Sequence, residues 1–296
     1  MEGANRIMKI GIVGQGYVGT AVRTVFEKHY DVLTYDVKNT LSNISSLEEL
    51  VRAVEVIFVC VPTPMNKDRS CNTDIVEDVI SDINDSMYID ILNHHPKMDK
   101  TVVIKSTVPP GTTERLNEEN DNVTVIFNPE FLTEANFIDD FKNQTRIIIG
   151  GSRPATTRLR QIYSLVFPNV PIIKTGSTTA EMVKYFTNKF LATKVSFANE
   201  MNLICDRLGI DYDKVVEYSI YDERLGKSHW AVPGPDGHYG FGGSCFPKDM
   251  QAIINFAESL GIEPSVLKGT WSKNLDIRPE EDWKQLKGRA VVEEKA

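Results

Sequence analysis

Seven short apolar runs, separated by segments with helical patterns, constrain the fold of this chain more than any other feature. The runs are MKIGIV (8–13), DVLTY (31–35), VIFVCV (56–61), TVVIK (101–105), VTVIF (123–127), RIIIG (146–150) and VPIIK (170–174). They are continuous rather than alternating, as is typical of strands that are covered on both faces of a sheet. The segments between them with helical patterns include 45–54, 73–93 and 154–166. This alternation predicts an α/β fold whose first domain, residues 1–175, is a doubly wound parallel sheet.

A long helix is expected after the last of these runs. Thr178 and Glu181 have the spacing of a capping box, and Gly209 is suited to end a helix. Apolar residues recur between these caps with a helical period, at positions 183, 186, 190, 191, 195, 198 and 201. Shorter helices are expected further on, on either side of a loop rich in glycine and proline. Residues 176–296 are therefore predicted to form a smaller, mainly helical domain.

Charge and cysteine usage exclude several classes of protein. The formal net charge is −8 and no run of lysine and arginine occurs, so we expect no nucleic-acid partner. No apolar run is long enough to span a bilayer and no signal peptide is visible, so we expect no membrane partner. The four cysteines lack the spacing of a zinc site or of a disulfide framework. We therefore expect that the chain binds no metal, and that its thiols are reduced in a cytoplasmic protein.

The first apolar run leads into the glycine-rich sequence GIVGQGYVG, which contains Gly14, Gly16 and Gly19. In a strand–loop–helix context the first glycine permits a tight turn, the second lets a pyrophosphate approach the backbone, and the third lets helix and strand pack closely. Asp36 ends the second predicted strand and is suited to bind ribose hydroxyls, which favours NAD over NADP. The pattern predicts a Rossmann-type domain that binds NAD. A flavin, or a glycine turn without any nucleotide, are the alternatives.

Polar residues follow three of the predicted strands, where open parallel sheets bind their ligands. Thr107 follows the fourth strand, and NPEFLTEAN follows the fifth. In that segment Asn128 could cap a helical turn, and Glu130 and Glu134 would share one face of it. Alternatively, both glutamates simply favour a helix N-terminus.

Lys184 and Asn188 are also four residues apart, on the long predicted helix. A cation and an amide on one helix face could be directed at the same oxygen atom. The alternative is that this face is merely solvated.

The segment HYGFGGSCFPKDM (238–250) contains glycines at 240, 242 and 243, and with Gly237 just before it four glycines precede one thiol. Among the cysteines, only Cys245 has glycines on one side and a Lys–Asp pair on the other. It precedes a predicted helix start at Pro247, with Lys248 three residues on, and both features would favour a thiolate. The alternative is a buried, inert thiol.

These motifs together resemble the UDP-glucose/GDP-mannose dehydrogenase family. The resemblance covers about residues 8–260 and rests on GIVGQGYVG, VCVPTP, STVPPGTTERL, NPEFLTEANFIDDF, AEMVKYFTNKFLATKVSFANE and GFGGSCFPKD. It implies oxidation of a sugar C6 alcohol to a carboxylate with two NAD, UDP-glucose ranking first among substrates. An aldehyde can yield a second hydride only after a nucleophile makes its carbon tetrahedral, which implies a thiohemiacetal and then a thioester.

The resemblance also implies a role for each matching catalytic residue. Cys245 is the implied nucleophile, and the glycines before it form a loop over the sugar. Lys184 and Asn188 stabilise the alkoxide and the oxyanions, and Asp249 takes part in proton transfer. Glu130 is the implied general base for hydrolysis of the thioester. Two further catalytic positions, which order water and the cofactor end, are Glu134 and Thr107.

Binding residues follow from the same resemblance. Those implied for the cofactor are Gly14, Gly16, Tyr17, Val18, Gly19, Asp36, Pro62, Thr63, Thr107 and Glu134. Those implied for the substrate are Phe131, Leu132, Lys184, Asn188, Arg224, Phe241, Gly242, Gly243 and Cys245. Arg224 would reach the substrate of a neighbouring subunit, which implies a homodimer through the long helix. The alternative for Arg224 is a surface salt bridge.

The chain departs from the family pattern near its C-terminus. Family members usually continue into a second α/β domain that holds the nucleotide, and no second pattern of that kind follows residue 260. The loop before Cys245 is longer and richer in Pro and Gly than expected, and His229, Trp230, His238 and Tyr239 could replace some of the missing contacts. The sequence does not distinguish UDP from GDP.

Two other functions are compatible with the sequence. A two-electron β-hydroxyacid dehydrogenase would share the phosphate loop and the Lys-x-x-x-Asn pair, but would not need Cys245. An NAD-binding protein with weak or no catalysis would have lost its substrate-binding part.

Overall fold

The apolar runs form seven strands of one sheet in the computed structural model, which describes residues 8–93 and 99–293. The strands are β1 (Lys9–Val13), β2 (Asp31–Tyr35), β3 (Val56–Val59), β4 (Thr101–Ile104), β5 (Thr124–Phe127), β6 (Ile147–Gly150) and β7 (Ile172–Thr175). Their order in the sheet is β2-β1-β3-β4-β5-β6-β7. All seven predicted strands are confirmed.

The predicted parallel sheet is confirmed, with one antiparallel junction. Strands β1 to β5 pair in parallel, and β6 pairs with β7 in parallel. However, β6 meets β5 in the antiparallel sense, through the pair Phe127–Gly150. The sequence could not show this, because a continuous apolar strand that is buried on both faces looks the same in either direction.

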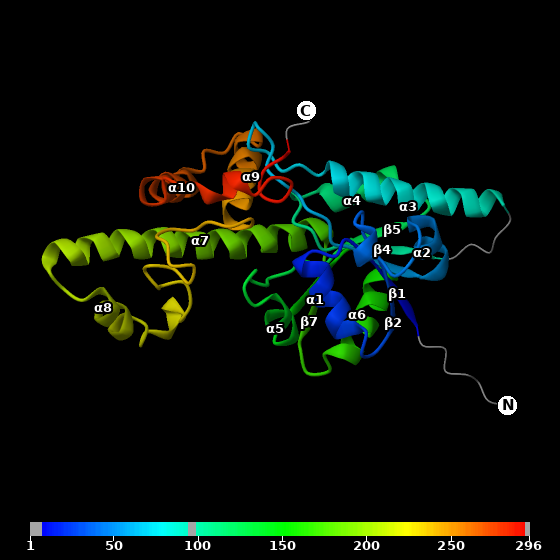
Figure 1. The fold of residues 1–296 in the computed structure, drawn as a ribbon, viewed down its shortest axis with the longest axis horizontal. Coiled ribbons are helices and arrows are strands. Elements are labelled where there is room, and N and C mark those ends of the chain that lie inside the picture. The colour runs from blue at the N-terminus through cyan, green and yellow to red at the C-terminus, as the bar shows by residue number, and fades with distance from the viewer. Residues whose placement is uncertain (1–7, 94–98, 294–296) are drawn as a thin grey trace. The chain divides into compact units, whose positions relative to one another are not determined.

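Helices cover both faces of this sheet, which confirms the doubly wound arrangement (Figure 1). One face is covered by α1 (Tyr17–Phe26), α5 (Phe137–Lys142) and α6 (Ala155–Val166). The other is covered by α2 (Leu47–Ala53), α3 (Asp74–Leu92) and α4 (Thr112–Glu119), with the short 3-10 helix η1 (Asn39–Leu41) after β2. Every residue of β3, β4 and β6 is buried, as expected of strands that are covered on both faces.

The long helix α7 (Ser177–Leu208) forms as predicted, but its capping box does not. Glu181 is fully buried and accepts hydrogen bonds from the backbone N–H of Gly111 at 2.6 Å and of Thr113 at 2.8 Å. The Thr113 hydroxyl donates a third bond at 2.5 Å. These donors lie at the N-terminus of α4, whose first N–H groups have no partner within the helix. Glu181 therefore caps α4 rather than its own helix, and burial raises the pKa of its carboxyl group.

The chain divides into two units, and α7 runs through both. The first unit comprises Met1–Thr63 and Thr73–Lys184, and the second comprises Pro64–Asn72 and Tyr185–Ala296. We predicted the division at residue 175. In the structure the first turns of α7 are bound to the sheet domain by Glu181, as described above. That Pro64–Asn72 belongs to the second unit could not be predicted, because it depends on long-range hydrogen bonds of Met65 with Ala290 and Val292.

The second unit is mainly helical. Besides the rest of α7 it contains α8 (Tyr212–Ser219), α9 (Phe246–Ser259) and α10 (Ser265–Ile277). Two 3-10 helices are η2 (Glu223–Leu225) and η3 (Asp282–Gln285). Its apolar cores are small. Two of them form where α9 packs on α7 and α10, and another forms between α7 and α8.

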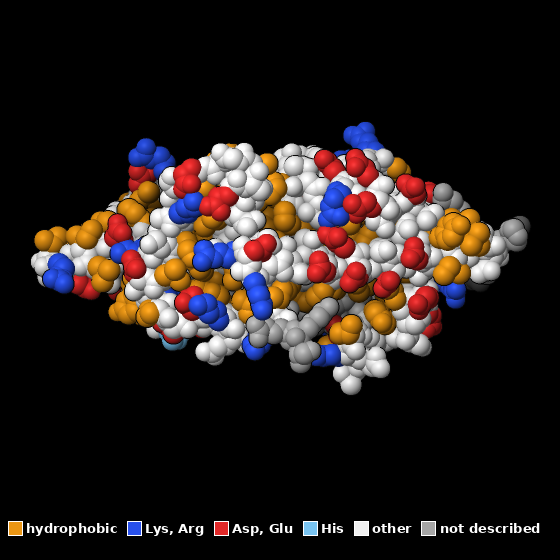
Figure 2. Space-filling model, turned by 90° about the horizontal axis from the view of Figure 1, so that it is seen from above, with side chains coloured by type: hydrophobic (Ala, Val, Ile, Leu, Met, Phe, Trp, Pro, Cys, Tyr) orange, Lys and Arg blue, Asp and Glu red, His pale blue; other side chains and the backbone are white. Residues whose placement is uncertain are grey.

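The surface of the first unit shows no basic face along α3. Exposed Asp78, Asp82 and Asp85 recur along this helix, and Figure 2 shows acidic side chains over this part of the molecule. Such a surface does not attract a polyanion. Over the residues that the structure describes, no helix is both long and apolar enough to cross a membrane.

Candidate functional site

The glycine-rich loop between β1 and α1 has the geometry of a phosphate loop. Gly14 has φ +88°, and a Cβ atom there would lie 2.7 Å from the Cys60 carbonyl oxygen. A Cβ atom on Gly19 would lie 1.9 Å from the carbonyl oxygen of Gly14. By contrast, a Cβ atom on Gly16 would meet nothing within 4 Å. Two glycines are therefore needed by the fold, and the third leaves space beside the backbone.

Asp36 and the N-terminus of α1 complete this loop. The Asp36 carboxylate accepts hydrogen bonds from the backbone N–H of Gln15 at 2.7 Å and of Lys38 at 2.8 Å. Gly16 is the N-cap of α1, and no side chain caps the helix there. Its first N–H groups can therefore bind an anionic phosphate, with the Asp36 carboxylate fixed beside the loop. These residues fit NAD. Tyr17 and Val18 begin α1, and Pro62 and Thr63 follow β3, the strand that pairs with β1.

Substitutions of two glycines distinguish the role of this loop in binding NAD from its role in folding. Gly16→Ala is expected to raise the Kd for NAD at least about tenfold without changing thermal stability, because its methyl group fills only the open space. Gly19→Ala is expected to lower stability by about 1–3 kcal/mol, because its methyl group overlaps the backbone. Calorimetric titration with NAD and thermal unfolding of both variants measure the difference. Unchanged NAD affinity in Gly16→Ala would contradict the assignment.

A buried polar cluster lies at the carboxyl ends of β4 and β5. Lys105 Nζ is 3.0 Å from Glu130 Oε2, and their side chains are 1% and 8% exposed. Lys105 also donates to Asn128 Oδ1 at 2.9 Å. The Asn128 amide donates to the Ile148 carbonyl oxygen, and no helix follows it, so the prediction that Asn128 caps a helical turn is wrong.

The expectation that Glu130 and Glu134 share a helix face is also wrong. Residues 128–136 contain no helix, and α5 begins only at Phe137. Pro129 and the bonds of Asn128 hold this segment as a loop. Glu130 is buried, whereas Glu134, Phe131, Leu132 and Thr107 are half-buried.

Lys184 and Asn188 are buried on α7, so this face of the helix is not solvated. Lys184 Nζ donates a hydrogen bond to the main-chain oxygen of Glu130 and lies 5.2 Å from the ring centre of Phe131. In the second unit, the Asn188 amide donates to Asp249 Oδ2 at 3.0 Å. Each of the two side chains therefore touches another residue that the sequence singled out.

Cys245 is exposed and is the N-cap of α9, which excludes the alternative of a buried, inert thiol. Asp249, one turn into the helix, is 2% exposed and accepts a bond from Lys248 Nζ at 2.6 Å. Burial opposes the charge on Lys248, but Asp249 and then the thiols of Cys71 and Cys245 raise its pKa. The thiol thus stands beside a lysine that stays charged and an aspartate that Asn188 orients.

The glycine loop before Cys245 is held by residues that sequence reasoning missed. Asn274 on α10 accepts from the N–H of Phe241 at 2.7 Å and donates to its carbonyl oxygen at 3.0 Å. Asp282 accepts from the N–H of Gly243 at 3.1 Å. A Cβ atom on Gly242 would lie 2.4 Å from the guanidinium carbon of Arg278, so the loop and this side chain need a glycine there.

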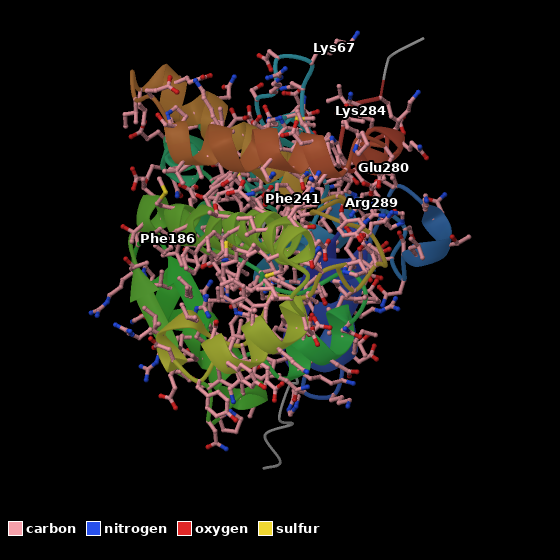
Figure 3. All side chains as sticks on the ribbon, turned by 90° about the vertical axis from the view of Figure 1, so that its left-hand side faces the viewer. Lys67, Phe186, Phe241, Glu280, Lys284 and Arg289 are labelled. Atoms are coloured by element: carbon pink, nitrogen blue, oxygen red, sulfur yellow. The ribbon has the colours of Figure 1, made fainter. Side chains whose placement is uncertain are left out.

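Arg278 connects Asp282, which holds the end of the glycine loop, to Asp236 at its start. Its guanidinium is bound to Asp282 at 2.7 Å and to Asp236 at 2.8 Å. Arg289 donates to the hydroxyl of Ser244, next to the thiol, at 3.3 Å (Figure 3). The sequence signal for these contacts was an arginine flanked by acidic residues, in LDIRPEED. The structure shows that this arginine is buried and paired, as buried arginines usually are.

The aromatic residues of the longer loop have partners within the second unit. Trp230 donates to the Gly226 carbonyl oxygen at 2.8 Å, and its ring lies under Lys194 Nζ. His229 stacks on Phe246 at 6.0 Å between ring centres, and His238 is 3.3 Å from Glu280. Tyr239 is half exposed.

Arg224 lies in η2 with its side chain 88% exposed. Its Nε is 2.8 Å from Asp222 Oδ1, and its Nη2 also bonds to that carboxylate. Within one chain it therefore forms the surface salt bridge that we gave as its alternative role.

The two units have the parts of an NAD-dependent dehydrogenase: a dinucleotide loop on a parallel sheet, and a thiol at a helix start. Residues 32–167 match the NAD binding domain of the UDP-glucose/GDP-mannose dehydrogenase family, and residues 178–275 match its central domain. The chain belongs to this family. The cofactor expected from the loop, NAD, is thereby confirmed.

Individual relatives agree with this assignment. A UDP-glucose 6-dehydrogenase of Haloferax volcanii is 31% identical over 92% of this chain and 70% of its own length. One of Pseudomonas aeruginosa is 36% identical over 78% of this chain, which spans only 50% of that protein. The structure of a UDP-glucose dehydrogenase from Pyrobaculum islandicum is 32% identical with a TM-score of 0.82, covering 97% of this chain and 72% of that one.

Proposed function

We propose that the chain oxidises the C6 alcohol of a nucleotide sugar to a carboxylate with two NAD, with UDP-glucose as the substrate and UDP-glucuronate as the product. One observation carries this proposal: Cys245 is an exposed thiol at the start of α9, beside the buried Lys248–Asp249 pair. A two-electron dehydrogenase needs no such nucleophile. The names of the relatives support the choice of sugar.

The first oxidation converts the alcohol to an aldehyde. Bound NAD supplies the hydride acceptor in each oxidation. Lys184 and Asn188, buried on α7, would stabilise the alkoxide as the alcohol loses its proton. Asp249 accepts a bond from Asn188 and would receive that proton on its way to solvent.

The second oxidation proceeds through the thiol. The Cys245 sulfur adds to the aldehyde carbon, and this C–S bond leaves a tetrahedral carbon from which a second hydride departs, giving a thioester. Water that is deprotonated by Glu130 then adds to the thioester carbon. The C–S bond breaks, the acid is released, and the thiol takes up a proton.

The stoichiometry of the reaction tests this proposal. With UDP-glucose limiting, we expect two NADH for each sugar consumed, measured by absorbance and by chromatography of the nucleotide sugars. GDP-mannose serves as the matched sugar control. One NADH per sugar would instead support the two-electron reaction, and bound NAD without turnover of either sugar would support a non-catalytic role.

A homodimer through α7 is the second part of the proposal. Phe186, Phe190 and Phe197 are 73%, 59% and 54% exposed, and they recur at helical spacing along α7. Phe186 is labelled in Figure 3. Exposed apolar stripes of this kind are typical of interaction surfaces. A second copy would cover this stripe, and Arg224 would then act on the partner's substrate.

Two variants test the dimer. Phe186→Glu/Phe190→Glu is expected to sediment as a monomer, because two charges cannot be buried in an apolar interface. Leu165→Glu, at a similarly exposed position on α6, is the control and should sediment as the unsubstituted chain does. If Arg224 acts across the interface, a mixture of inactive Arg224→Ala and Cys245→Ser chains regains part of the activity after subunit exchange. No recovery in dimers shown to exchange would contradict that role.

A further inference from the structure

Lys105 is a buried cation to which the reaction above gives no role. Its Nζ atom lies 3.0 Å from Glu130 Oε2, 2.9 Å from Asn128 Oδ1 and 3.3 Å from the Tyr163 hydroxyl. Asn128 and Tyr163 accept hydrogen bonds from this ammonium, and the Glu130 carboxylate forms an ion pair with it. The side chain is 1% exposed, so no solvent competes for these bonds.

The oxygens around Lys105 are fixed by the sheet and by α6. The Tyr163 hydroxyl donates to Asn128 Oδ1 at 2.5 Å, and the Asn128 amide donates to the Ile148 carbonyl oxygen at 2.7 Å. The ring of Phe141 lies 5.6 Å from Lys105 Nζ on another side. The ammonium is therefore held in one place by strands β5 and β6 and by helix α6.

Only one of the groups facing this ammonium carries a negative charge. Burial raises the pKa of the Cys60 thiol and of the Tyr163 hydroxyl to about 12, so both stay neutral near pH 7. Burial opposes the charge on Lys105, but Glu130 outweighs it and raises the pKa of the lysine. Lys184 Nζ bonds to the main-chain oxygen of Glu130 and not to its carboxylate. Lys105 and Glu130 thus form a one-to-one ion pair.

We propose that Lys105 is a positioning residue that fixes the Glu130 carboxylate for the hydrolysis of the Cys245 thioester. The carboxylate cannot swing away without leaving a buried ammonium uncompensated, which is strongly unfavourable. Its Oε1 atom accepts one bond, from the N–H of Phe131 at 3.0 Å, and retains a lone pair for a water molecule. This inference rests on the proposed function, since it concerns the last step of that reaction.

Pre-steady-state kinetics of Lys105→Gln test the role. With UDP-glucose and NAD in excess, the variant is expected to release a burst of two NADH for each Cys245 at an unchanged rate. Its steady-state rate should then be about 100-fold lower, because only the general-base step is impaired. Mass spectrometry of acid-quenched protein should show the acyl group accumulating on Cys245. A merely structural role would lower the burst and the steady state together, and that result would overturn the proposal.

A second comparison does not depend on a stable Lys105→Gln variant. The variants are Glu130→Gln and Lys105→Gln/Glu130→Gln. Neither contains the Glu130 carboxylate, so neither buries a carboxylate without its lysine partner. If Lys105 acts through Glu130, these two variants should release the acid at rates within about twofold of each other. A further drop of about tenfold in the double variant would overturn the proposal. The unsubstituted chain distinguishes the two failures. If it forms fewer than two NADH for each UDP-glucose, the proposed function is wrong and this inference is wrong with it.

Discussion

Replacing Cys245 by serine is expected to lower the rate of acid formation by on the order of 10⁶-fold, the scale of loss when an enzyme nucleophile is removed. A thiol ionises much more readily than a hydroxyl, so serine adds poorly to the aldehyde. Cys245 is exposed at the start of α9, so a side chain of the same shape leaves the packing unchanged. We therefore expect unaltered thermal stability and NAD affinity. The first oxidation remains possible, and at most one NADH should form for each sugar.

The measurement is NADH formed per sugar, together with capture of the aldehyde by an added hydrazine. Cys71→Ser is the matched control, because this residue lies in the same unit and also contributes to the raised pKa of Lys248. It should give two NADH per sugar at nearly the parent rate. Two NADH per sugar at an undiminished rate in Cys245→Ser would remove the thiol from the mechanism.

The positions of the strands could be predicted from the sequence because each is a continuous apolar run. The phosphate loop could be predicted because its glycines are required by the local backbone: a Cβ atom on Gly14 or Gly19 would clash with the main chain. Cys245 could be singled out for a similar reason, since the glycines and the helix start adjoin it in the chain. Each of these signals is short-range.

The contacts that hold the site could not be predicted, because each joins residues that are distant in sequence. Glu181 looked like the cap of its own helix, yet it binds the N-terminus of α4. Asn128 looked like a helix cap, yet it connects Lys105 to β6. Asn274 and Asp282 belong to a segment that carried no motif, yet they hold the loop before Cys245. A short polar side chain has several possible partners, and only the fold selects one.

Substitution of Lys184 tests the hydride-transfer steps, whereas substitution of Cys245 tests the covalent step. Lys184→Met is expected to lower both NADH-forming steps by about 10³-fold, because the alkoxide and the later oxyanions lose their cation. The methionine side chain is close in length and apolar, so the buried position on α7 remains filled. Loss of its hydrogen bond to the main-chain oxygen of Glu130 should lower stability by only about 1 kcal/mol. The two variants therefore differ in kind: one NADH at most for Cys245→Ser, and almost none for Lys184→Met.

Stopped-flow absorbance with UDP-glucose, and separately with the C6 aldehyde, distinguishes these outcomes. Lys184→Met should be slow with either compound, whereas Cys245→Ser should be slow only in oxidising the aldehyde. Lys214→Met, an exposed lysine on α8, is the control for a change of net charge and should behave as the parent chain does. A normal NADH burst followed by slow turnover in Lys184→Met would place this lysine in thioester hydrolysis instead. Its bond to Glu130, rather than its charge beside the alkoxide, would then be the contact that matters.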